Sequence, residues 1–155
     1  MLDKVVITDT SCLIALSKLE VISILQKLYS EVIVTSEIVD EFGEALPDWI
    51  KIQNASNLNY KKLLENILDA GEASAIALAL ELKDVILILD DLKGRKEAQK
   101  LGFKITGTLG VLFKAKQNGF ITEIKPYIEK LKNVGFRISE EIEMELLLKS
   151  NELNS

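Results

Sequence analysis

The 155-residue sequence contains no histidine and only one cysteine, Cys12. Without histidine, a Ser-His-Asp triad, a Cys-His pair and a His-ligated zinc site are all excluded. One cysteine forms neither an internal disulfide nor a four-thiolate metal site, which suits a reducing compartment. Any hydrolytic activity must therefore use carboxylates, hydroxyls, lysines or a metal ion held by oxygen atoms.

Proline, glycine and long apolar runs are also scarce. Two prolines and eight glycines are too few for a disordered or linker-rich chain, and the length suits one compact domain spanning residues 1–155. The longest apolar runs, such as residues 85–89, are far shorter than the roughly 20 residues of a membrane helix, and the N-terminus has no signal-peptide layout. We expect a cytoplasmic protein with no membrane association.

The net charge of −5 conceals an uneven distribution along the chain. Residues 1–92 carry a net charge of −9, residues 93–137 carry +8, and residues 138–155 carry −4. The basic stretch is either a set of solvated helix faces or a surface for a polyanion, and the sequence leaves both interpretations open. The overall acidity alone therefore does not exclude a nucleic-acid partner.

Short apolar runs alternate with segments of helical periodicity. We expect strands at 4–9, 32–35, 49–52, 85–89 and 103–105. We expect helices at 13–19, 21–28, from the cap residue Ser36 to Pro47, and at 60–68, 73–82, 93–101, from 108, 124–133 and 139–149. This alternation predicts a three-layer α/β/α sandwich with a central parallel sheet of four to five strands.

Acidic residues follow two of the predicted strands. Asp9 ends the first, and Asp90 and Asp91 follow the run at 85–89. Glu41 lies one and a half turns into the helix after the second strand, and Glu72 lies at the start of the alanine-rich helix. Ligands of such sheets collect at the carboxyl ends of the strands. Several carboxylates in one crevice either protonate or surround a cation, and oxygen ligands without histidine or thiolate favour Mg²⁺ or Mn²⁺. Such an ion can activate water against a phosphodiester.

Each acid also has a structural explanation. Asp9 precedes Thr10 and Ser11 and could cap the next helix, and one of Asp90 and Asp91 is expected to be a cap or turn residue. Glu72 suits a helix N-terminus electrostatically. The inference therefore depends on the joint placement of the acids, not on any one of them.

The motifs around these acids resemble the PIN-domain nucleases, in particular a bacterial and archaeal PIN-like subgroup with a Gly-Thr-Leu-Gly segment. The resemblance covers nearly the whole chain. In order, the motifs are Asp9–Ser11, Ser36–Phe42, Gly71–Ala73, Asp90–Arg95, Gly107–Gly110 and Gly135–Ser139.

The resemblance implies a metal-dependent endoribonuclease, often the toxin of a toxin–antitoxin pair and often a homodimer. It implies metal-binding and catalytic roles for Asp9, Glu41, Glu72 and Asp91, with Asp90 as a further metal-binding candidate. Thr10 and Ser11 would lie beside the site, where hydroxyls can orient water or phosphate. A small antitoxin protein would have to cover the acidic crevice.

The basic stretch begins directly after the acidic pair, with Lys93, Arg95 and Lys96. We predict that these three side chains bind the phosphate backbone of an RNA substrate.

Two departures from the family pattern leave a second hypothesis open. The third acid is usually Asp but here is Glu72, and the fourth usually follows a Thr two residues earlier, which is absent before Asp91. The alternative is a catalytically inactive PIN-like module that binds nucleic acid or protein. A phospho-receiver domain fits less well, because its acidic pair would follow the first strand.

Overall fold

The computed structural model describes residues 4–153; the outer ends of the domain predicted for residues 1–155 lie outside the described residues. Five short strands form one parallel sheet in the order β3-β2-β1-β4-β5. The strands are β1 (Val5–Thr8), β2 (Glu31–Val34), β3 (Ile50–Ile52), β4 (Ile86–Ile88) and β5 (Lys104–Thr106). The strand order reverses between β1 and β4, which makes the gap beyond their carboxyl ends the expected ligand crevice.

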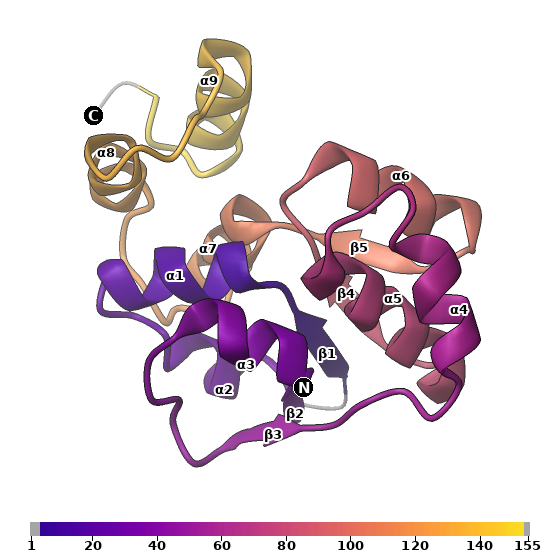
Figure 1. The fold of residues 1–155 in the computed structure, drawn as a ribbon. Helices are drawn as coiled ribbons and strands as arrows, with labels where there is room; N and C mark the ends of the chain where they lie inside the picture. Colours follow the sequence, from indigo (N-terminus) through magenta and orange to yellow (C-terminus); the bar gives the residue numbers. More distant parts are fainter. Residues whose placement is uncertain (1–3, 154–155) are drawn as a thin grey trace.

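Helices flank this sheet, as the sequence predicted (Figure 1). The helices within residues 4–153 are α1 (Thr10–Lys18), α2 (Ile24–Leu28), α3 (Ser36–Phe42), α4 (Leu58–Leu64), α5 (Ala70–Leu82), α6 (Leu92–Lys100), α7 (Thr108–Gln117), α8 (Lys125–Asn133) and α9 (Glu140–Lys149). Helices α1 and α2 contact α7, whereas α4 and α6 contact α5, and α3 contacts both α1 and α5. The α/β/α sandwich with a parallel sheet is therefore confirmed.

The core lies on both faces of β1 and β4 and along α5. Val6, Ile7, Leu87 and Ile88 have no exposed surface, as expected for strands covered on both sides. In α5, residues 71–79 are all buried. Small alanine side chains let this helix lie close to its neighbours, which fixes the position of its first turn.

The carboxyl edge of the sheet is level across its centre. Thr8 of β1 pairs with Ile88 of β4, and Ile88 pairs with Thr106 of β5. The Asp9 amide donates to the Ile88 carbonyl at 3.0 Å, so the ladder continues one residue beyond β1. Asp9 and Asp90 therefore leave the sheet side by side.

Helix α3 differs from its prediction at both ends. Thr35, not Ser36, is the cap residue, since its hydroxyl accepts a hydrogen bond from the Ile38 amide. The helix ends at Gly43, whose φ of 74° gives the left-handed cap that glycine adopts without strain, so the prediction that Pro47 ends it was wrong.

The two C-terminal helices lie apart from the sheet, with α8 above α1 (Figure 1). An ion pair between Lys132 and Glu143 links α8 to α9. A second one joins Lys116 of α7 to Glu152, which also accepts hydrogen bonds from the first amides of α8. None of the helices formed by residues 4–153 has the length and apolar character needed to span a bilayer.

Candidate active site

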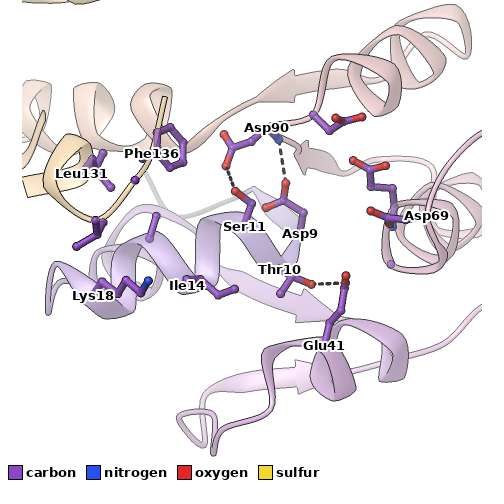
Figure 2. A pocket seen from close by; sticks show the side chains of 16 residues that line it. Asp9, Thr10, Ser11, Ile14, Lys18, Glu41, Asp69, Asp90, Leu131 and Phe136 are labelled. Carbon is purple, nitrogen blue, oxygen red and sulfur yellow. Dashed lines mark hydrogen bonds between the residues drawn. The ribbon is translucent and has the colours of Figure 1, made fainter. Parts of the chain in front are cut away.

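A cavity of about 550 Å³ opens at the carboxyl edge of β1 and β4. It contains all five acids predicted to form the site and both predicted hydroxyl residues; these are Asp9, Thr10, Ser11, Glu41, Glu72, Asp90 and Asp91. Figure 2 shows carboxylates from separate elements turned toward one space. Residues distant in sequence meet here because parallel strands deliver their ends to one edge.

Asp9 and Asp90 form the inner part of the site and are fixed by hydrogen bonds. One carboxylate oxygen of Asp9 accepts from the Cys12 amide and the other from the Asp90 amide, both at 2.8 Å. Asp90 in turn accepts from the Thr108 amide at 2.8 Å, the Thr108 hydroxyl at 2.6 Å and the Ser11 hydroxyl at 2.9 Å. The Asp90 carboxylate thus joins the start of α7 to the start of α1.

Glu41 reaches the cavity from α3. Its carboxylate accepts a hydrogen bond from the Thr10 hydroxyl at 2.7 Å. A side chain at Gly71 would place its Cβ 2.5 Å from the same carboxylate, so the glycine leaves the space that Glu41 occupies. Thr10 and Ser11 therefore each hold an acid of the site.

Glu72 enters the cavity from the first turn of α5. Its amide donates to Asp69, which caps this helix, at 2.8 Å. Asp69 also lines the cavity and was missed as a site residue in the sequence, although its position three residues before Glu72 is the spacing of a capping pair. A Cβ at Gly94 would lie 3.3 Å from the Glu72 carboxylate, so a second glycine makes room for an acid.

Asp91 is the cap residue of α6. One of its oxygens accepts from the amides of Lys93 and Gly94, at 3.1 and 3.4 Å. No donor among residues 4–153 is within hydrogen-bond distance of the other oxygen. Asp91 therefore faces the cavity with part of its carboxylate available to a ligand.

The buried acids are electrostatically strained. Burial, then the neighbouring Asp90, raises the pKa of Asp9 well above its usual value, against the opposing effect of its two amide hydrogen bonds. Burial, followed by the charges of Asp69, Asp91 and Asp9, raises the pKa of Glu72 to about 7. Each shift has the same origin, negative charge crowded into a poorly hydrated space, and a bound cation would reverse it.

The donor set fits a hard divalent cation, because the polar side chains that line the acidic part of the cavity offer oxygen alone. In residues 4–153, however, no three acidic or thiol groups are already gathered closely enough to hold a metal ion. The carboxylates surround the space instead of converging on one point. Binding an ion would require outer acids such as Glu41 and Glu72 to move inward, toward the fixed Asp9.

The predicted basic residues lie elsewhere. Lys93 and Lys96 line a separate groove of about 330 Å³ with residues 66–68. Arg95 donates from its guanidinium to the Leu89 carbonyl at 3.0 Å. The structure thus gathers the acids and hydroxyls into one cavity and places these three basic residues outside it.

Opposite the acids, the cavity has an apolar end that the sequence did not reveal. Its side chains are Ile14, Leu131, Val134 and Phe136, with Lys18 beside them. Figure 2 shows Leu131 and Phe136 on the side away from Asp69 and Glu41, with Asp90 on the side of the ring. The only signal in the sequence was the motif Gly135–Ser139, whose place beside α1 depends on how the C-terminal segment folds back.

A family model described as a PIN domain matches residues 5–152, a range that contains every residue of the cavity. A comparison with the curated proteins gave no match.

Proposed function

Because the chain belongs to the PIN domain family, whose members are generally nucleases, we propose that it is a metal-dependent endoribonuclease. It would use Mg²⁺ or Mn²⁺ to hydrolyse phosphodiester bonds of RNA. One observation carries the proposal. Acids that follow β1 and β4 share a cavity with acids of α3 and α5, and the two most buried of them have raised pKa values.

We assign the metal to Asp9, Glu72 and Asp91, with Glu41 completing the set. Asp9 and Asp91 are already oriented by amide hydrogen bonds, and Glu72 stands in the first turn of a buried helix. The Asp90 carboxylate already accepts three hydrogen bonds, so its proposed role is to position the others.

When bound, the cation would neutralise part of the phosphodiester charge and lower the pKa of a water that attacks phosphorus in line. The protein's own contribution is to hold the reacting groups in place. Thr10 keeps Glu41 turned to the cavity, and Ser11 restrains Asp90. The water forms a new P–O bond as an ester P–O bond breaks, giving a phosphomonoester and a hydroxyl.

The lysines of α6 have a more distant role in this proposal. Lys93 and Lys96 lie on the helix that Asp91 begins, next to but outside the cavity. An RNA strand leaving the cavity over α6 would meet their ammonium groups, which contribute to affinity without reading sequence.

The test is cleavage of a mixed-sequence single-stranded RNA with Mg²⁺ or Mn²⁺, by the wild type and by Asp9→Asn. Asp84→Asn is the matched control, since Asp84 is an exposed residue at the opposite end of the same central strands. We expect the wild type and Asp84→Asn to cleave and Asp9→Asn to be inactive while folded. Cleavage that survives Asp9→Asn or excess chelator would contradict the proposal, and absence of cleavage with retained RNA binding would favour the inactive binding module.

A role as the toxin of a toxin–antitoxin pair and a homodimeric state remain predictions from the resemblance, and a cytoplasmic location remains a prediction from the short apolar runs and the N-terminal sequence. An antitoxin would act by covering the cavity, so co-purification of a small protein that blocks cleavage would support the first of them.

A further inference from the structure

The apolar end of the cavity has side chains that are exposed to solvent and accessible to a ligand. Ile14 and Val134 are 38% and 47% exposed, and Leu131 is buried between the C-terminal segment and the core. These side chains continue the same cavity that holds the acids. A ligand held at the acids therefore has an apolar wall within the same space.

Phe136 is held at this wall by the backbone. Gly135 has a φ of 93°, a conformation that glycine adopts freely, and it turns the chain after α8. The Phe136 amide donates to the Leu131 carbonyl at 2.9 Å, which closes this turn. The ring is partly buried against the core and contributes to the cavity lining. The backbone turn and the packing against the core therefore place the Phe136 ring at this wall.

Lys18 supplies positive charge to the same end. It is in the last turn of α1 and lines the cavity. Of the cavity-lining side chains within residues 4–153 it is the one that carries positive charge, and no carboxylate in that range forms an ion pair with it. An anion bound near Phe136 would meet this ammonium group.

We propose that this end of the cavity is a nucleotide subsite, in which an unpaired base stacks on Phe136 while a neighbouring phosphate pairs with Lys18. This inference rests on the proposed nuclease function and adds to it a position for one unpaired base of the substrate. A base in a duplex has both faces covered, so only an unpaired base can use the ring. Phe136 and Lys18 line the same cavity as the acids, so a strand held at the acids can reach both groups.

A binding experiment tests the subsite without requiring cleavage. A short single-stranded RNA carrying one 2-aminopurine is titrated with protein in Ca²⁺, and stacking is followed by fluorescence quenching. We expect Phe136→Leu to weaken binding roughly 5- to 100-fold, the range for one stacked base, and Phe136→Trp to retain it. Phe120→Leu is the matched control, because Phe120 is an exposed ring that does not line the cavity.

Two further arms separate the base from the phosphate. With an end-labelled RNA that lacks the base at this position, followed by fluorescence anisotropy, wild type and Phe136→Leu should bind equally. Lys18→Met should reduce the dependence of log affinity on log salt by about 0.7, the value for one phosphate contact of a single strand.

The outcomes distinguish this inference from the proposed function. Equal binding of the intact RNA by wild type and Phe136→Leu overturns the subsite, even if the wild type cleaves RNA. Binding that depends on Phe136 without any cleavage supports the subsite and contradicts the nuclease. No RNA binding at all overturns the subsite and leaves a protein segment as the occupant of the apolar wall.

Discussion

Two buried glutamates on different elements have opposite electrostatic environments. Glu72 at the start of α5 is 8% exposed, and Glu152 after α9 is 4% exposed. Burial raises the pKa of both. At Glu152 this effect is outweighed by hydrogen bonds from the amides of Ile124 and Lys125 and by the Lys116 ammonium, which together lower its pKa.

At Glu72 the surroundings add to the effect of burial. Asp69, Asp91 and Asp9 each raise its pKa further, and a backbone hydrogen bond from Asp69 opposes them only weakly. Glu152 is therefore a carboxylate whose partners are part of the fold. Glu72 is a carboxylate surrounded by other acids, with no cationic side chain of the described residues to balance its charge. This is the pattern of a site that is completed by a bound cation.

The largest difference between the two glutamates is expected in activity. Glu72→Gln removes a proposed metal ligand and should lower RNA cleavage roughly 100-fold or more. Glu152→Gln lies outside the cavity and should retain wild-type cleavage per folded molecule. Initial cleavage rates of the two variants, corrected for the folded fraction by circular dichroism, measure these effects. Equal losses of activity in the two variants would contradict different roles for the two glutamates.

The second difference concerns stability. Glu152→Gln leaves Lys116 without its charge partner and should lower the free energy of unfolding by about 2–4 kcal/mol. Urea denaturation of the metal-free proteins at neutral pH measures this. Glu145→Gln is the control, because its ion pair with Lys149 is exposed and should contribute less than about 1 kcal/mol. A Glu152→Gln protein as stable as this control would contradict the structural role.

The third difference is a dependence on pH. The pKa of Glu72 is about 7 in the folded protein and 4.5 is its ordinary value, so the folded state holds this proton more tightly. Its stabilising effect is complete below about pH 4.5 and is lost as the pH rises through 7. Metal-free wild type should therefore lose about 1–3 kcal/mol over this range, and Glu72→Gln should lose less. Identical pH profiles for the two proteins would show that Glu72 is not strained.

The smallest effect expected is stabilisation by metal. Mg²⁺ or Mn²⁺ at ten times its Kd should stabilise the wild type by about 1.4 kcal/mol, a rise of a few degrees in Tm. Glu152→Gln should show the same rise and Glu72→Gln little or none. A Tm increase of equal size in all three proteins would indicate non-specific binding.

Local sequence patterns predicted the sheet and the meeting of the acids at its carboxyl edge. The run at 85–89 lacks alternation, which is why β4 could be recognised as a strand covered on both faces. Its pairing with β1 then placed Asp90 beside Asp9, as expected. The parallel pairing of the strands is sufficient for this prediction that Asp9 and Asp90 are neighbours, because it brings the carboxyl ends of the strands to one edge of the sheet.

The features that the sequence did not reveal depend on direction and on long-range packing. In α6, Gly94 and Ala98 are the buried residues, so Lys93 and Lys96 turn toward a different groove from the acids. The four-residue spacing of Gly94 and Ala98 could have indicated which face of α6 is buried, whereas the charge count along the chain says nothing about direction. The wall around Phe136 had only the motif Gly135–Ser139 as a local signal, because the wall forms only when the segment after α8 folds back toward the Ile14 side of α1.

Binding of Mn²⁺ measured by electron paramagnetic resonance tests the central claim most directly, because it detects the ion without requiring a substrate. We expect the wild type and Glu152→Gln to bind Mn²⁺ with the same affinity, and Asp9→Asn and Glu72→Gln to bind it far more weakly. Equal Mn²⁺ binding by all four proteins, or none by the wild type at millimolar metal, would contradict the assignment of this cavity as a metal-dependent active site.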